Sequence, residues 1–282
     1  MINSLVVAGA GTMGSGIALS AALVGLPVVL FDTNESVLDR ASQSIRSNLN
    51  FLENKTKITT QEKTNAFNCI HFTGDIELCK GDIIIEAIIE RVDAKVELFG
   101  RLNALNTREC IFASNTSSLS ITEIQKDIAH PERVAGMHFF NPAHVMKLVE
   151  VVKGEQTSEE TASALVSLCK LLNKTPVMCI DSPGFIVNRV ARPFYLEAMK
   201  IVESGLASFE DVDAVMEASG FKMGPFKLMD LIGMDINYAV STSLFEALDK
   251  PERLKPSRLQ AAKIETGELG KKTGKGFYNY TI

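Results

Sequence analysis

A glycine-rich turn near the start of the chain constrains the fold more than any other feature. An apolar strand pattern at residues 4–8 leads into GAGTMG, a helical pattern follows, and residues 27–31 form a second strand pattern. This order is the βαβ unit that binds dinucleotides, because the turn brings backbone N–H groups and the helix start to a pyrophosphate. The sequence therefore predicts a Rossmann-like fold with a phosphate-binding turn made of Gly9, Gly11, Thr12, Met13 and Gly14.

Each glycine in this turn has its own physical task. Gly9 permits the tight turn, Gly11 lets the backbone approach the pyrophosphate, and Gly14 lets the helix pack closely on the strand. Asp32 closes the second strand, where a carboxylate accepts hydrogen bonds from the hydroxyls of an adenosine ribose. Its charge repels a 2′-phosphate, and no arginine follows at once in DTNESV. The residues therefore predict NAD, rather than NADP, as the cofactor.

Strand and helix patterns continue to alternate after the first unit. The next strand patterns are at residues 70–73, 82–87 and 110–114. A helical pattern at residues 91–105 separates the last two, which favours parallel strands with a ligand crevice at their C-terminal ends. Residues 36–66 interrupt the alternation with two helical patterns around a polar turn, which predicts a helical arm.

Polar residues gather where these strands end. Glu86 and Glu90 follow one strand, and SNTSS at residues 114–118 follows the next. Their hydroxyl and amide groups are suited to hold a ligand oxygen, and they also suit the N-cap of a helix beginning near Leu119. Both roles are compatible, with different residues in each.

Two of the four histidines and one acid lie in the apolar run GMHFFNPAHVMKLVEVVKG, residues 136–154. The strand patterns at 133–140 and 147–154 have a connector too short for a helical crossover, so we expect them to be antiparallel. With the turn centred on His144, His138 lies opposite Glu150, and opposed Cβ atoms are about 4.5–5.5 Å apart. His144 is then expected to be an exposed loop residue.

A histidine and a carboxylate in this arrangement suit acid–base chemistry. The carboxylate accepts the imidazole N–H, fixes the tautomer and supports the protonated ring. The other ring nitrogen then exchanges a proton near neutral pH. We predict that His138 and Glu150 form a working pair, with a purely structural pair in the core as the alternative.

The last third of the chain has helical patterns only. They cover residues 185–204, 209–219, 227–248 and 256–267. Pro183 and Gly184 mark a boundary, which predicts an N-terminal domain over residues 1–183, with the arm, and a helical domain over 184–282. Ser208 and Asp211 form a capping signal for the second helix. Several helices are apolar on more than one face, which favours a homodimer through this domain.

Composition excludes several classes of partner. A net charge of −5 over 282 residues argues against nucleic acid and anionic membrane as partners. The five cysteines have no metal-ligand spacing, so we expect no metal site and a reducing compartment. The longest apolar stretch is interrupted by Gly25 and Pro27 and does not resemble a membrane span. The chain opens directly in a strand pattern, and we expect a cytoplasmic protein without a targeting segment.

Five motifs in order resemble the L-3-hydroxyacyl-CoA dehydrogenases, in particular the small bacterial 3-hydroxybutyryl-CoA dehydrogenases. They are GAGTMGSGIA, ASNTSSLSI, GMHFFNPAHVMKLVEVV, SPGFIVNRV and GKKTGKGFY. The resemblance runs from the first strand to the C-terminus and is specific because the motifs occur together. It implies a reversible, NAD-dependent oxidation of (3S)-3-hydroxyacyl-CoA to 3-oxoacyl-CoA, with a short acyl chain such as 3-hydroxybutyryl, and a homodimer.

The resemblance also implies roles for single residues. His138 takes the proton from the 3-hydroxyl, Glu150 orients His138, and Ser117 and Asn188 hydrogen-bond the substrate oxygens. The positions that match contacts to the cofactor are Asp32, Glu90, Lys95, Asn115, Ser117 and Lys272. The positions that match contacts to coenzyme A are Ser117, Asn48 and Lys55. The chain departs from the family's pattern at Ala143 and His144, where a small apolar residue and a proline are usual.

Other functions remain open at this point. RVARPFYLEA and SGFKMGPFKLMDLIGMD resemble the branch that acts on 3-hydroxyadipyl-CoA, whose terminal carboxylate Arg192 is able to pair with. We expect instead that Arg192 is a residue of the helix surface. A non-catalytic dinucleotide-binding relative is a second alternative, although all four chemical positions hold competent residues. Dehydrogenases of free 3-hydroxy acids use a lysine for proton transfer, and none stands at position 138 or 188.

Overall fold

The computed structural model describes residues 2–281. Contacts between residues divide the chain into two compact units, Met1–Ser182 and Pro183–Ile282. Each unit is described by itself below. No helix within the described residues is both long enough and apolar enough to span a membrane.

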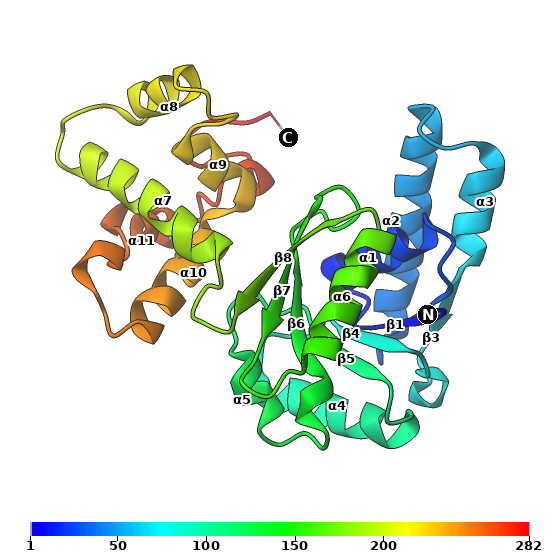
Figure 1. The fold of residues 1–282 in the computed structure, drawn as a ribbon. Coiled ribbons are helices and arrows are strands. Elements are labelled where there is room, and N and C mark those ends of the chain that lie inside the picture. Colours follow the sequence, from blue (N-terminus) through cyan, green and yellow to red (C-terminus); the bar gives the residue numbers. More distant parts are fainter. Residues whose placement is uncertain (1, 282) are drawn as a thin grey trace. The chain divides into compact units, whose positions relative to one another are not determined.

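The first unit is built on a sheet of eight strands in the order β3-β2-β1-β4-β5-β6-β7-β8 (Figure 1). Neighbouring strands are parallel except β6 and β7, which are antiparallel. This confirms the predicted mostly parallel sheet with one antiparallel pair. The strands are β1 Leu5–Ala8, β2 Val28–Phe31, β3 Ile70–Thr73, β4 Ile83–Glu86, β5 Ile111–Ser114, β6 Val134–Phe139, β7 Leu148–Lys153 and β8 Thr175–Ile180.

The strand order reverses between β1 and β4. From β1 the chain builds outward through β2 and β3, and it then returns to place β4 and β5 on the other side. In open α/β sheets such a reversal leaves a crevice at the C-terminal ends of the strands, because the two connections diverge there. The glycine turn and Glu86 both lie at this edge.

The six α-helices described in this unit are α1 Thr12–Ala22, α2 Glu35–Asn54, α3 Thr60–Asn68, α4 Val92–Leu105, α5 Ile121–Gln125 and α6 Glu159–Leu171. The arm expected over residues 36–66 corresponds to α2 and α3, which lie against each other. The side chain of Asn34 caps α2, and Thr59 with Glu62 forms a capping box for α3. The arm is also part of the core, because α2 buries an apolar stripe at helical spacing, Leu38, Ala41, Ile45 and Leu49.

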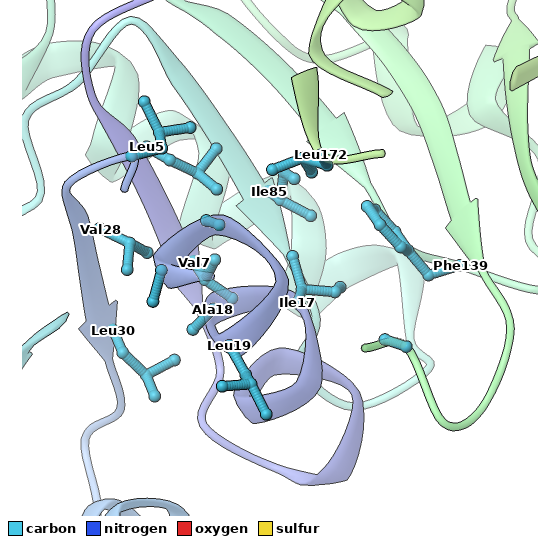
Figure 2. Packing of buried hydrophobic residues seen from close by; sticks show 14 of the residues in the cluster. Leu5, Val7, Ile17, Ala18, Leu19, Val28, Leu30, Ile85, Phe139 and Leu172 are labelled. Carbon is cyan, nitrogen blue, oxygen red and sulfur yellow. The ribbon is translucent and has the colours of Figure 1, made fainter. Parts of the chain in front are cut away.

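The core of the first unit packs α1 against the central strands. Figure 2 shows Val7 of β1 and Leu30 of β2 on the side of the sheet covered by Ile17, Ala18 and Leu19 of α1. Helix α1 is buried on almost every side, because Gly, Ala and Ser fill most of the positions at which it meets its neighbours. Strands β1 and β4 are fully buried, as expected for parallel strands covered on both faces.

The edge strand β8 and the helix before it were not predicted from the sequence. Strand β8 pairs in parallel with β7, and its side chains are exposed or half-buried. At its end, Asp181 accepts hydrogen bonds from Ser120 Oγ at 2.6 Å and Thr122 N at 2.8 Å. The antiparallel pair is therefore not the last element of the sheet.

The second unit contains the α-helices α7 Val187–Glu203, α8 Phe209–Ala218, α9 Pro225–Ile232, α10 Met234–Ala247 and α11 Arg258–Glu265. Its own core includes Leu196, Met199, Phe226 and Met229. The predicted capping signal of Ser208 and Asp211 is confirmed as a capping box on α8. The described residues of the chain also include the short 3-10 helices Ile76–Leu78, Pro131–Arg133, Glu252–Leu254 and Lys271–Thr273.

The prediction of one helix over residues 227–248 was wrong. Gly233 has φ of +103°, which ends α9 and starts α10 at the same residue. A positive φ interrupts the helix, and glycine adopts it at little cost. The apolar pattern runs on through LIGMDI, so periodicity alone did not reveal the break.

The tight packing of the glycine turn gives a stability prediction. A Cβ added to Gly14 would lie 1.7 Å from the carbonyl oxygen of Gly9, whereas Gly100 in α4 has nothing within 4 Å of an added Cβ. We expect Gly14→Ala to lower the free energy of unfolding by about 1–3 kcal/mol or more, because a packed backbone must shift. Gly100→Ala is the control and should raise it by up to about 1 kcal/mol. Urea denaturation measures both, and equal effects would contradict the packing argument.

Candidate active site

The glycine turn begins directly after β1. Gly9 has φ of +104°, and the close approach of Gly14 to Gly9 leaves no room for a side chain at position 14. Gly11 is the N-cap of α1, which starts with Thr12 and Met13 and has neither a side-chain cap nor an acidic residue in its first turn. Its first N–H groups and positive dipole end are therefore suited to a phosphate. These observations confirm the tasks predicted for Gly9 and Gly14.

Asp32 is held beside this turn. Its Oδ2 accepts a hydrogen bond from Ala10 N at 2.9 Å, and its Oδ1 accepts one from Asn34 N at 3.0 Å. The carboxylate is half-buried, at the end of β2. The turn and Asp32 thus form one unit with the donor set and the carboxylate that a dinucleotide requires.

The antiparallel strands bring His138 and Glu150 together. The register pairs His138 with Glu150, and Nδ1 lies 2.7 Å from Glu150 Oε2. Glu150 is 0% exposed and His138 6% exposed, so the contact is shielded from water. The predicted register is confirmed. Because Glu150 engages Nδ1, the ring nitrogen suited to exchange a proton with a ligand is Nε2.

A buried ion pair lies at the C-terminal end of β4. Lys95 of α4 donates to Glu86 Oε1 at 2.6 Å, and neither side chain is more than 1% exposed. Glu86 also accepts hydrogen bonds from Ser114 Oγ at 2.6 Å and Ile88 N at 2.7 Å. Burial raises the pKa of Glu86, while Lys95 and Ser114 oppose this rise. The pair ties β4, α4 and β5 together.

Lys95 also reaches the second acid of this region. Its Nζ lies 3.2 Å from Glu90 Oε2, and Glu90 Oε1 accepts hydrogen bonds from Thr116 Oγ1 at 2.5 Å and Ser117 N at 3.1 Å. Burial raises the pKa of Glu90, but Lys95 and these hydrogen bonds outweigh burial and keep it below the usual value. Glu90 therefore carries a negative charge that orders the loop containing Ser117.

The remaining residues of this loop have separate structural tasks. Asn115 Oδ1 accepts a hydrogen bond from Phe139 N at 2.9 Å, which links the loop to the strand of His138. The helix expected from Leu119 begins later, because Ser120 is the N-cap of α5. The loop 115–118 is thus held by Glu90 and Asn115, which leaves capping to Ser120.

Two of the residues matched to coenzyme A, Asn48 and Lys55, lie on the arm. Asn48 Nδ2 donates to Ser44 O at 2.9 Å along α2, and Lys55 is the C-cap of that helix, with its ammonium 5.8 Å from the Phe51 ring.

The expectation that His144 is an exposed loop residue was wrong, because its side chain is half-buried. Burial and the positive charge of Lys174 lower the pKa of His144.

Three predicted residues belong to the second unit. Asn188 lies in the first turn of α7, and Lys272 is paired with Asp235 at 2.6 Å. The expectation that Arg192 lies on the helix surface was wrong, because it is 3% exposed and donates to Asn237 O at 2.9 Å and Ser241 Oγ at 2.9 Å. Burial lowers its pKa to about 10. The charge pattern of the sequence gave no sign that Arg192 is buried, because its hydrogen-bond partners come from α10.

Sequence reasoning missed two residues next to the site. Lys174 is buried, and its Nζ donates to Ala143 O at 2.6 Å and Met146 O at 2.9 Å, in the connector after His138. Burial lowers its pKa to about 8. Arg40 lines a pocket beside the glycine turn. No motif marked either residue, and no group of histidine, cysteine or acidic residues within 2–281 is arranged to hold a metal ion.

Comparison with known proteins identifies the class to which this fold and site belong. The family model described as 3-hydroxyacyl-CoA dehydrogenase, NAD binding domain, matches residues 4–182. The model described as 3-hydroxyacyl-CoA dehydrogenase, C-terminal domain, matches residues 184–280. The chain therefore belongs to the 3-hydroxyacyl-CoA dehydrogenase family, and NAD is its cofactor.

Individual relatives agree with this assignment. A 3-hydroxyadipyl-CoA dehydrogenase of Escherichia coli is 43% identical over 99% of the chain, which spans 59% of that relative's length. A probable 3-hydroxybutyryl-CoA dehydrogenase of Deinococcus radiodurans is 40% identical over 97% of the chain and 99% of the relative. The crystal structure of (S)-3-hydroxybutyryl-CoA dehydrogenase from Ralstonia eutropha has a TM-score of 0.95 at 38% identity, with full coverage of both chains.

The buried pair of Glu86 and Lys95 gives a second prediction. We expect Lys95→Met to lower the free energy of unfolding by about 3–5 kcal/mol, because it leaves a buried carboxylate without its counter-ion. Lys126→Met is the control, since it removes a lysine from an exposed pair with Glu123. It should have little effect, because water and salt screen surface pairs. Thermal and chemical denaturation compare the two, and an equally mild effect would contradict the role given to the buried pair.

Proposed function

We propose that this protein catalyses the reversible, NAD-dependent oxidation of (3S)-3-hydroxyacyl-CoA to 3-oxoacyl-CoA. The observation that carries the proposal is the buried contact of 2.7 Å between His138 Nδ1 and Glu150 Oε2. It supplies a proton acceptor in the same unit as the glycine turn and Asp32. The E. coli relative extends well beyond the part aligned with this chain, so the activity is proposed on the chain's own residues and its family.

His138 is the general base in this proposal. NAD, when bound, provides the acceptor for the hydride that leaves C3 of the substrate. His138 Nε2 takes the proton of the 3-hydroxyl as the carbonyl forms, and it returns the proton in the reverse direction. Glu150 accepts the Nδ1–H bond, so it holds the tautomer and stabilises the imidazolium. Their burial strengthens this interaction, because little water competes for it.

Other residues are proposed to bind and orient. Ser117 and Asn188 hydrogen-bond the substrate oxygens, and Asn48, Ser117 and Lys55 contact coenzyme A. The proposed cofactor contacts are Gly9, Gly11, Thr12, Met13, Gly14, Asp32, Glu90, Lys95, Asn115, Ser117 and Lys272. Asp32 selects NAD through the ribose hydroxyls, and Glu90 in addition fixes the loop of Ser117. In this scheme residues 1–183 bind NAD and residues 184–282 serve substrate binding and dimerisation.

The acyl group is proposed to be short, as in 3-hydroxybutyryl-CoA. The relatives include proteins named for 3-hydroxybutyryl-CoA and one named for 3-hydroxyadipyl-CoA. Arg192 was the residue suited to the carboxylate of the longer substrate, but it is buried inside the helical unit, where its Nη1 donates to Asn237 O and Ser241 Oγ. This favours the substrate without a terminal carboxylate, and 3-hydroxyadipyl-CoA is the alternative.

The assembly is proposed to be a homodimer through the helical unit, in the cytoplasm. Val190 and Leu206 of this unit are 72% and 78% exposed, and several other large apolar side chains there are exposed as well. Exposed apolar surface of this kind is commonly buried against a second copy.

The substrate is tested by following NADH oxidation with acetoacetyl-CoA, 3-oxoadipyl-CoA and free acetoacetate. We expect the highest kcat/KM with acetoacetyl-CoA and very low turnover of the free acid, because the acid lacks the coenzyme A contacts. A higher value with 3-oxoadipyl-CoA would favour the alternative substrate. Equal turnover of free acetoacetate would contradict a CoA-dependent enzyme, and no turnover of any of them would favour a non-catalytic relative.

His138→Gln is expected to lower kcat by about 10²–10⁴-fold, because general acid–base catalysis is lost. NADH binding, measured by fluorescence titration, should remain close to the wild-type value. His71→Gln is the control, because His71 lies exposed on β3, and it should leave kcat unchanged. A wild-type kcat in His138→Gln would remove His138 from the mechanism.

A further inference from the structure

A pocket of about 440 Å³ lies beside the glycine turn, entirely within the first unit. Its walls come from the start of α1, the first four turns of α2 and the connector 141–144 between β6 and β7. This volume is within the range of small-molecule sites. The pocket brings together residues that the sequence suggested for two different ligands, Thr12 for the dinucleotide and Asn48 for coenzyme A.

The charge of the lining has one sign. Arg40 and His144 line the pocket together with neutral polar residues such as Ser44 and Asn48, and no aspartate or glutamate is among the lining residues. Within residues 2–281 neither Arg40 nor His144 forms an ion pair or a side-chain hydrogen bond. The uncapped start of α1, at Gly11 and Thr12, adds its positive dipole end. The pocket is therefore electrostatically suited to an anion.

The wall that carries His144 is held rigidly against α1. Ala143 O accepts hydrogen bonds from Lys174 Nζ at 2.6 Å and from Ser20 Oγ at 3.3 Å. A Cβ added to Gly16 would lie 3.1 Å from Ala143 Cβ, so α1 and the connector are in close contact there. The backbone next to His144 is thus anchored at the pocket through Ala143. Burial and, second to it, the positive charge of Lys174 lower the pKa of His144, so Arg40 supplies the permanent charge of the pocket.

We propose that Arg40 and His144 bind a phosphate group in this pocket. The inference rests on the proposed function for the identity of the ligand, since both nucleotides of that reaction carry phosphates. One source is the pyrophosphate of NAD, and the other is the phosphates of coenzyme A. Arginine is well matched to phosphate, because its planar donors make charge-assisted hydrogen bonds to the oxygens.

The test uses the whole chain with Arg40→Gln and His144→Leu. Arg101→Gln is the matched control, because Arg101 is also an exposed arginine on a helix, α4, and does not line the pocket. The dissociation constant of NADH is measured by fluorescence titration without substrate, and those of coenzyme A and pantetheine by calorimetry. These measurements require no turnover, so they remain valid if the proposed activity fails.

We expect Arg40→Gln to weaken the binding of one of the two nucleotides about tenfold, because a hydrogen bond to a charged group is lost. His144→Leu should weaken the binding of the same nucleotide by a smaller factor. Weaker binding of coenzyme A, with unchanged binding of NADH and pantetheine, identifies the phosphates of coenzyme A as the ligand. Weaker binding of NADH, with unchanged binding of coenzyme A, identifies the pyrophosphate of the dinucleotide. Dissociation constants of both nucleotides equal to those of the control would overturn the proposal.

Discussion

The buried carboxylate of Glu150 is the constraint on which the site depends. A carboxylate removed from water is costly unless a partner compensates, and the antiparallel pairing of β6 with β7 supplies His138 at that position. A slip of the register by one residue would turn every side chain of β7 to the opposite face and leave Glu150 without this partner. The same requirement explains why a short connector, and no crossover helix, joins these two strands. It also places the connector residues 141–144 beside α1.

Local patterns in the sequence were sufficient for the elements that depend on near neighbours. The βαβ unit followed from the glycine spacing, and the register of His138 and Glu150 followed from the length of the connector. Strand β8 was missed because TPVMCI has no alternation of buried and exposed side chains at the edge of the sheet. The break at Gly233 was missed because an isolated glycine is often tolerated within a helical pattern.

Buried charges were the least predictable part of the molecule. The sequence marks Glu86 as a polar residue at a strand end and Lys95 only through the family resemblance, yet the two form one ion pair. Their contact depends on how α4 packs on the sheet, which no spacing rule contains. Arg192 was misjudged for the same reason, since Asn237 and Ser241 lie far from it in the sequence. Partners of this kind require tertiary structure, whereas the paired strands placed His138 and Glu150 from spacing alone.

The edge formed by β8 has a consequence for solubility. At the start of β8 the N–H of Thr175 donates to Lys147 O, just before β7, and directly after β8 the N–H of Asp181 donates to Lys153 O of β7. The odd-numbered residues therefore direct their N–H groups toward β7, and the nitrogen of Pro176 faces the open edge. A proline there has no N–H to offer to another strand. At the opposite edge, β3 is only four residues long. Another strand thus finds no donor at Pro176 and few pairing positions along β3, which limits growth of the sheet at both edges.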